Sequence, residues 1–249
     1  MEIVIDQGNT RIKIALFHND DIIEIKTFDN NESIDVNTML NNLELKYPGN
    51  GTIDLGLFSS VGKINQNFVR EMGSRIRLLI LDPSLSIPVN IKYSTPETLG
   101  HDRIALAVAA HAKFPGHDVL VIDAGTCITC DFIEKAGKYL GGSISPGISM
   151  RFNALHTFTT NLPLVTQTKT PELIGDSTVK SIQSGVINGV KAEVMGFIEQ
   201  YKSLYPSLIV VFTGGDLNYF DKNTKNNIFA IPNLVLLGLK EILEYNANK

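Results

Sequence analysis

Residues 3–10 read Ile-Val-Ile-Asp-Gln-Gly-Asn-Thr, and residues 119–126 read Val-Leu-Val-Ile-Asp-Ala-Gly-Thr. Each stretch is an apolar run that ends in an aspartate, followed two residues later by a glycine and then by a threonine. An apolar run of this length before turn residues is typical of a buried β-strand. Asp6 and Asp123 lie 117 positions apart, close to half of the 249-residue chain. The repeat predicts an α/β fold built from two similar lobes.

The pattern around the first stretch predicts a lobe of the order βββ-αβα. Residues 12–16 alternate between apolar and polar or small side chains, so residues 3–16 are interpreted as a β-hairpin. Beyond the hairpin we expect, in chain order, a strand at 22–28, a helix at 33–47 capped by Ser33, a strand at 53–58, a helix at 65–74, a strand at 77–81 and an alanine-rich helix at 99–114.

A second lobe of the same type is expected after the repeated stretch. Its elements are expected as strands near 128–134 and 138–143, a long helix at 177–204, a strand at 210–212 before Thr213-Gly214-Gly215-Asp216, and a closing helix at 232–244. We expect residues 1–114 and 115–249 to form the two lobes, each with a mixed sheet and flanking helices, and a cleft to lie between them.

Composition and charge restrict the class of partner. Lys and Arg number 22 and Asp and Glu 26, for a net charge of −4, and no dense basic stretch occurs, so nucleic acid is not expected as a partner. Charged residues at 2, 6, 11 and 13 interrupt the apolar centre that a signal peptide needs, and no apolar run reaches about 18 residues. With two cysteines only, we expect a cytoplasmic protein without membrane association.

The two aspartate-containing turns carry the chemistry. A carboxylate can hold a divalent metal, and amides beside glycine can face phosphate oxygens, so two such turns across a cleft suit a nucleoside triphosphate with Mg²⁺. Either turn alone is better explained as a plain hairpin, and only the two together, each after a buried strand, favour the functional interpretation. Thr213-Gly214-Gly215-Asp216 allows a base or ribose to approach the backbone, or is a simple strand turn. Neither G-x-x-x-x-G-K-[ST] nor G-x-G-x-x-G occurs.

A third acidic position stands at the start of the alanine-rich helix, in Leu99-Gly100-His101-Asp102-Arg103. A helix N-terminus favours an ionised Asp102 and an anionic ligand, and Arg103 offers a forked donor. A carboxylate of near-normal basicity is an adequate base for phosphoryl transfer, although Asp102 paired with Arg103 is the alternative. Cys127 and Cys130 match C-x-x-C, but they lie in an expected strand without a second pair, so neither redox nor zinc chemistry is expected.

These motifs and their order resemble the type III pantothenate kinase family, within the superfamily of acetate kinase, sugar kinases, Hsp70 and actin. The resemblance runs nearly end to end and is carried by residues 6–11, 99–103, 123–126, 141–147, 162–163, 176–178, 184–185 and 213–216. It implies two actin-like, ribonuclease H-like lobes, and phosphorylation of pantothenate to 4′-phosphopantothenate by ATP, the first step toward coenzyme A. Cys127 and Cys130 depart from the small residues, such as Ala or Thr, that are more frequent in the family.

The resemblance also implies residue roles. Asp102 is the expected general base. ATP phosphates and a divalent cation such as Mg²⁺ would be bound at Asp6, Gln7, Gly8, Asn9, Thr10, Arg11, Ile12 and Lys13, with Asp6 as the divalent-metal ligand and Thr126 as a further nucleotide contact. Pantothenate would be held by Tyr93, Gly100, His101, Asp102, Arg103 and Thr178, the last across a homodimer interface. Asp123 would bind a monovalent cation, K⁺ or NH₄⁺.

Two other functions fit the residues. One is a nucleotide-binding regulatory or chaperone-like protein that phosphorylates nothing, against which the Asp102-Arg103 pair argues, because a pure binder needs no base. The other is a kinase for another hydroxylated acid or sugar, and only the family resemblance selects pantothenate. Gly141, Gly142, Pro146 and Gly147 either shape a turn or touch a ligand.

Overall fold

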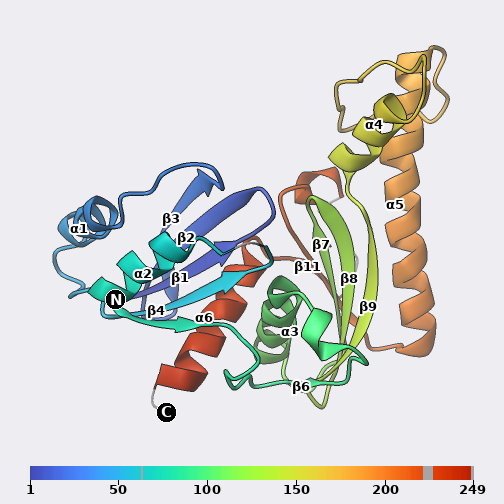
Figure 1. Ribbon diagram of the computed structural model, residues 1–249. Coiled ribbons are helices and arrows are strands. Elements are labelled where there is room, and N and C mark those ends of the chain that lie inside the picture. The colour runs from blue at the N-terminus through green and yellow to red at the C-terminus, as the bar shows by residue number, and fades with distance from the viewer. Residues whose placement is uncertain (63, 221–226, 248–249) are drawn as a thin grey trace. The chain divides into compact units, whose positions relative to one another are not determined.

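The computed structural model describes residues 1–62, 64–220 and 227–247. The chain forms two compact units, Met1–Ala112 with Leu234–Lys249 and Lys113–Asn233 (Figure 1). Each unit has a mixed sheet with flanking helices, which confirms the expected duplicated α/β fold. The division differs from the expected one in a single respect, because the C-terminal helix belongs to the first unit and not to the second.

The first unit has a five-stranded sheet in the order β3-β2-β1-β4-β5. Strands β1 and β2 are the expected antiparallel hairpin, and β1, β4 and β5 are parallel. The elements of this unit are β1 (Glu2–Gln7), β2 (Arg11–His18), β3 (Asp21–Asp29), α1 (Val36–Lys46), β4 (Leu55–Ser60), α2 (Gln66–Arg75), β5 (Arg77–Ile80), β6 (Asn90–Ile91), the 3₁₀ helix η1 (Pro96–Thr98), α3 (His101–Lys113) and α6 (Leu234–Ala247).

Each face of this sheet is covered by a different helix pair. Ile3 and Ile5 of β1 are buried in one cluster with apolar residues of α1 and α2. Val4, between them, is buried on the opposite face with residues of α3 and α6. Since successive side chains of a strand point to opposite faces, an unbroken apolar run such as 3–5 is what a sheet covered on both sides requires.

Helix α6 packs closely on the first unit because it has no side chain at Gly238. A Cβ at Gly238 would overlap the carbonyl oxygen of Ala105 in α3. Lys240, which is buried, forms ion pairs with Glu2 of β1 and with Glu244. The sequence pattern of α6 does not identify the strand face it covers, which is why its unit was assigned wrongly.

The second unit is built around strands in the order β11-β10-β7-β8-β9. Strands β7, β10 and β11 are parallel, and β8 and β9 continue as antiparallel neighbours. Its elements are β7 (Val119–Ala124), β8 (Cys127–Glu134), β9 (Lys138–Pro146), α4 (Ile148–Thr157), α5 (Thr178–Leu204), β10 (Ile209–Thr213), the 3₁₀ helix η2 (Leu217–Tyr219) and β11 (Ile228–Ala230).

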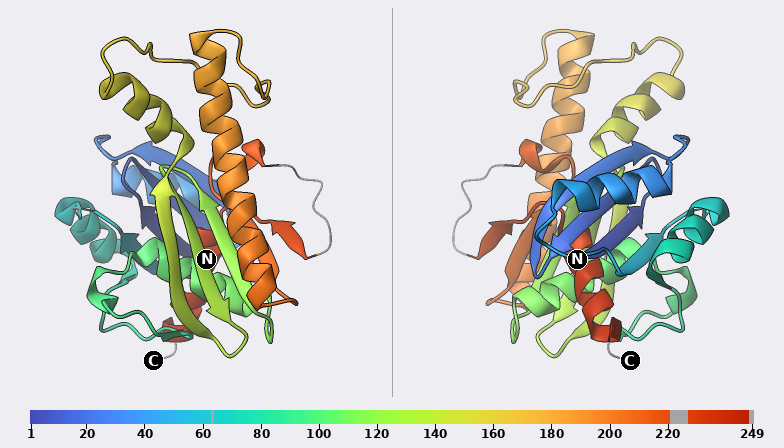
Figure 2. Two further views of the ribbon diagram at one scale, coloured as in Figure 1. Left: turned by 90° about the vertical axis from the view of Figure 1, so that its right-hand side faces the viewer. Right: turned by 90° about the vertical axis from the view of Figure 1, so that its left-hand side faces the viewer.

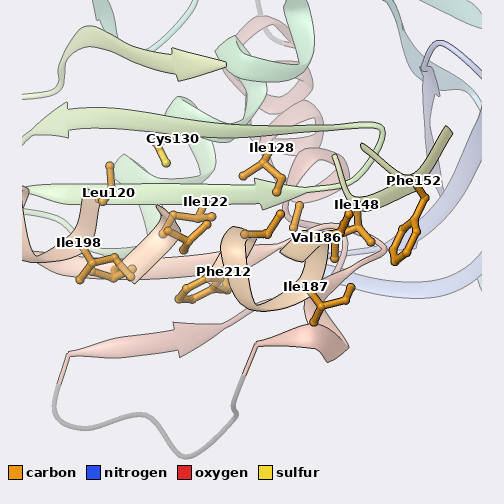
Figure 3. Close-up of a cluster of buried hydrophobic side chains, with 14 of the residues drawn as sticks. Leu120, Ile122, Ile128, Cys130, Ile148, Phe152, Val186, Ile187, Ile198 and Phe212 are labelled. Atoms are coloured by element: carbon orange, nitrogen blue, oxygen red, sulfur yellow. The ribbon is translucent and has the colours of Figure 1, made fainter. Parts of the chain in front are cut away.

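The long helix α5 runs along one face of this sheet, as the left view of Figure 2 shows, and α4 packs against α5. Ile122 of β7, Ile128 of β8 and Phe212 of β10 meet Val186 and Ile198 of α5 in one buried cluster (Figure 3). This cluster holds the strand ends that lead into the turns at 125–126 and 213–216.

One local expectation was wrong, and one helix was not predicted. Helix α1 is capped by Asp35 and not by Ser33, because the Asp35 carboxylate accepts hydrogen bonds from the Thr38 amide and hydroxyl at 2.9 and 2.8 Å. Helix α4 was not expected at all, since it lacks a capping side chain and begins directly after Gly147. Its buried residues, Ile148 and Phe152, show the helical spacing that would have indicated it.

Candidate functional site

The turn between β1 and β2 is held by Asn30, which follows β3. The Gly8 amide donates to Arg11 O at 2.9 Å, and Asn30 Nδ2 donates to Gly8 O and Asn9 O, each at 2.9 Å. The Asn30 amide donates to Thr10 O at 3.2 Å. Within the described ranges, the amides of Asn9 and Thr10 donate no hydrogen bond. Such a turn, with its carbonyl groups occupied, suits an anionic ligand at its amides. Sequence reasoning missed Asn30.

Three polar side chains stand side by side where β1 ends. Asp6 is paired with Lys13 across the β1–β2 ladder and with Ser59 across the β1–β4 ladder. Residues opposite each other in neighbouring strands share a face, and here it is the face of Val4 and Leu57, which α3 and α6 cover. The N-terminus of α3 therefore comes to the same face as Asp6.

Asp6 is held in an environment that opposes its ionisation. Burial, followed by the charge of Asp102, raises the pKa of Asp6 to about 6, against the opposing effect of Lys13. Asp102 is therefore near enough for its charge to act on Asp6. Asp6 Oδ1 is buried and has no hydrogen-bond partner among the described residues. A buried, unpaired carboxylate oxygen beside a second carboxylate fits a divalent cation, which would neutralise both.

Asp102 occupies the first turn of α3, where its Oδ1 accepts a hydrogen bond from the Arg103 amide at 2.8 Å. Gly100 makes this orientation possible, because a Cβ there would overlap Asp102 Oδ1. The buried Arg103 lies over the ring of Tyr93, with its Cζ 5.8 Å from the ring centroid, in a cation–π contact. His101 Nδ1 is buried and has no partner among the described residues. The structure thus brings together the five positions expected to hold the acceptor substrate in the first unit.

The repeated turn of the second unit, at Gly125 and Thr126, packs against two other turns. The Gly147 amide donates to Thr126 O at 3.1 Å, and the Asp216 amide donates to Ala124 O at 2.9 Å. A Cβ at Gly147 would overlap Gly125 O and Thr126 O. These contacts gather the turns at 123–126, 146–147 and 213–216 into one cluster.

At two further positions of the second unit, Gly214 and Gly142, close packing of the backbone leaves no room for a side chain. At Gly214, which has a φ of +96°, a Cβ would overlap Ala124 O and the Asp123 carboxylate. At Gly142 it would overlap Cys130 O in the neighbouring strand. Gly142 and Gly147 are therefore required by backbone packing. Among the described residues, Cys127 and Cys130 form no disulfide; Cys127 is half-buried and Cys130 is buried in the α5-facing core.

Thr178 is the first residue of α5 and is exposed, after the Ser177 cap. It lines an open groove of about 710 Å³ between α4 and α5, together with Arg151, Leu155 and Leu162. The groove is mostly apolar, and the exposed apolar side chains of Phe158, Leu173 and Ile174 lie in the segments flanking it, with 85%, 80% and 82% of their surface accessible.

Among the described residues, no cluster of three or more His, Cys, Asp or Glu side chains could hold a metal ion. Within the same residues, no helix is both long enough and apolar enough to cross a membrane.

Because the pKa of Asp6 is raised in the folded protein, its ionised carboxylate lowers the free energy of unfolding, and this loss depends on pH. Below about pH 3.8 Asp6 is protonated in folded and unfolded chains; between there and about pH 6 only the unfolded chain ionises, so stability falls as the pH rises. We expect Asp6→Asn to raise the free energy of unfolding of the ligand-free protein by about 1–3 kcal/mol at pH 8 and by less at pH 5. Urea unfolding at both pH values measures this difference. Asp20→Asn, at an exposed turn, is the control, and a gain that is larger at pH 5 would contradict the prediction.

Comparison with known proteins identifies the family of the chain. A family model described as type III pantothenate kinase matches residues 2–200. A type III pantothenate kinase of Christiangramia forsetii is 46% identical over 99% of both chains. Among solved structures, a Baf family putative transcriptional activator from Campylobacter jejuni superposes with a TM-score of 0.64 at 20% identity, covering 99% of this chain and 100% of the other.

A putative 2-dehydro-3-deoxygalactonokinase from Sinorhizobium meliloti has a TM-score of 0.55 at 12% identity, over 100% of this chain and 98% of that one. At such identities the two structural matches show the fold alone, and they agree with the actin-like arrangement expected from the sequence. The family assignment rests on the sequence relatives. By the family match and by identity over its full length, the chain belongs to the type III pantothenate kinase family.

Proposed function

We propose that this kinase transfers the γ-phosphoryl group of ATP to the primary hydroxyl of pantothenate with Asp102 as the general base. Type III pantothenate kinases phosphorylate pantothenate in coenzyme A biosynthesis, and a kinase of this family uses ATP with a divalent cation. The observation that supports Asp102 as the base is its position in the first turn of α3, where the Arg103 amide holds its Oδ1 and its charge raises the pKa of Asp6.

Phosphoryl transfer passes through a loose transition state, in which the attacking hydroxyl loses its proton late. A carboxylate that accepts a hydrogen bond from that hydroxyl orients it and takes its proton as the new P–O bond forms. The Asp102 carboxylate is suited to this, because the Arg103 amide holds Oδ1 and leaves Oδ2 for the substrate.

The phosphate end of the site is assigned to residues 6–13. The Asn9 and Thr10 amides and the Lys13 ammonium would contact phosphate oxygens, and the Asp6 carboxylate would hold the divalent cation, for which we propose Mg²⁺. The cation supplies charge neutralisation at the phosphates when bound. In the second unit, Thr126 is proposed as a nucleotide contact and Asp123 as the ligand of K⁺ or NH₄⁺.

The acceptor end is assigned to Tyr93 and residues 100–103. Arg103, which lies over the ring of Tyr93, offers a planar pair of donors that would match the pantothenate carboxylate. The experiment that tests the assignment measures ADP release with and without pantothenate, and with and without K⁺. ATP consumption that needs no pantothenate would favour the regulatory nucleotide binder instead.

A homodimer is proposed from the exposed apolar side chains near Thr178. Phe158, Leu173 and Ile174 are more exposed than apolar side chains of a monomer usually are when they gather in one region. In such a dimer Thr178 would contact the pantothenate bound to the partner subunit.

A charge placed in this region tests the dimer. We expect Ile174→Asp to give a monomer in analytical ultracentrifugation and to raise the KM for pantothenate about tenfold or more, because one buried charge at an interface costs several kcal/mol. Leu45→Asp, at an equally exposed leucine of α1, is the matched control. A monomer with an unchanged KM would remove Thr178 from the pantothenate site.

A further inference from the structure

Ser59, at the end of β4, has a buried hydroxyl group that no described residue satisfies with a hydrogen bond. Ser59 is 0% exposed, and its Oγ has no hydrogen-bond partner among the described residues. Leaving a hydroxyl buried without a partner costs about 1–3 kcal/mol, which alanine at the same position would avoid. A buried hydroxyl of this kind indicates a ligand that satisfies it.

The strand register shows where the hydroxyl lies. Ser59 is directly opposite Asp6 in the parallel β1–β4 ladder, on the same sheet face, with the strands about 4.8 Å apart. Asp6 Oδ1 is likewise buried and without a partner. The next residue, Ser60, points to the opposite face and exchanges hydrogen bonds with Gly62, its Oγ donating to Gly62 O and accepting from the Gly62 amide, both at 3.2 Å. Two neighbouring serines thus differ in whether the protein itself satisfies them.

We propose that Ser59 is a positioning residue for the divalent cation: its hydroxyl hydrogen-bonds a water molecule in the hydration shell of the cation that Asp6 holds. Mg²⁺ in nucleotide sites retains several water molecules and binds through one or two carboxylates and the substrate phosphates. A hydroxyl beside a lone carboxylate is therefore the kind of group that orients such a water. This inference rests on the proposed function, because it assumes a metal-nucleotide complex at Asp6.

Binding of Mn²⁺ tests the role without turnover. Free Mn²⁺ is measured by electron paramagnetic resonance in the presence of a non-hydrolysable ATP analogue, for wild type, Ser59→Ala and Ser60→Ala. We expect Ser59→Ala to weaken Mn²⁺ binding about tenfold, the value of one hydrogen bond to a charged complex, and Ser60→Ala to leave it unchanged. Equal affinity in wild type and Ser59→Ala would overturn the role of Ser59 alone. Wild-type protein that binds no Mn²⁺ with the analogue would overturn the proposed cation site as well.

Thermal unfolding separates this role from a structural one. Ser59→Ala removes an unsatisfied group, so the ligand-free variant should unfold at the wild-type temperature or above it. A purely structural serine predicts the reverse, a lower unfolding temperature with unchanged Mn²⁺ affinity, and that result would refute the proposal. If Ser59→Ala does not fold, Ser59→Cys repeats the measurement with a side chain of similar size that is a poorer hydrogen-bond donor.

Discussion

Asp102→Asn should lower kcat for pantothenate phosphorylation by a factor of about 10²–10⁴, the usual contribution of a positioned general base. The amide matches the carboxylate in size and can still accept a hydrogen bond from the Arg103 amide, so the start of α3 should keep its shape. What is lost is the group that accepts the hydroxyl proton. Steady-state ADP release, measured at saturating ATP and pantothenate, gives the ratio directly.

Two further variants locate the effect. Glu97→Gln, in the exposed 3₁₀ turn before α3, removes a nearby negative charge that lies outside the site and should leave kcat unchanged. Gly100→Ala keeps Asp102 but places a methyl group where its Oδ1 lies, so we expect a loss of kcat with the carboxylate still present. If Asp102→Asn retained wild-type turnover, Asp102 would not be the base, whatever its neighbours do.

Asp102→Asn also has an electrostatic consequence at Asp6. Burial is the main cause of the raised pKa of Asp6, and the charge of Asp102 is the second. Removing that charge should lower the pKa of Asp6 part of the way toward its ordinary value. The stabilisation gained from Asp6→Asn at pH 8 should accordingly be smaller in the Asp102→Asn background than in wild type.

The sequence predicted the parts of the site that follow from local pattern. The aspartate at the end of a buried strand, the glycine turn after it and the acidic first turn of α3 are signals within a few residues, and in the structure the charge of Asp102 raises the pKa of Asp6. The roles of Thr126, Asp123 and Thr178 remain predictions.

Residues defined by pairing between distant segments could not be found in this way. Asn30 holds a turn 21 residues before it, and Ser59 matters only because β4 pairs with β1 in one register. No residue close to Asn30 or Ser59 in the sequence indicates that either belongs to the site. A serine at the end of a strand differs from the next serine only in the face to which it points, and the register is a property of the folded sheet.

The position of the C-terminal helix likewise depends on packing between distant segments, which the local sequence does not predict. Chain order assigned α6 to the second unit, yet it packs on β1 and β4 of the first. The feature that selects this packing is the pair formed by Gly238 and Ala105, where two helices approach without intervening side chains. A glycine within a helix weakens it by about 1 kcal/mol relative to alanine, so Gly238 is costly unless close packing compensates.

Gly238→Ala should therefore destabilise the protein, although alanine is the better helix former. A Cβ at Gly238 would overlap backbone atoms of Ala105, which cannot rotate away, so α6 has to move off α3. Overpacking of this kind costs about 1–3 kcal/mol and exceeds the gain in helix propensity. The displacement would also disturb the neighbouring Lys240, whose ion pairs with Glu2 and Glu244 join α6 to β1.

Gly196 in α5 is the matched control for this prediction. It is also a helical glycine, but a Cβ built there meets nothing within 4 Å. Gly196→Ala should raise the free energy of unfolding by about 0.5–1 kcal/mol, through helix propensity and the reduced freedom of the unfolded chain. Urea unfolding of both variants gives two shifts of opposite sign if close packing decides at Gly238. Shifts of the same sign would mean that α6 can slide on α3 at little cost, and the backbone contact at Ala105 would then not be what holds the C-terminal helix on the first unit.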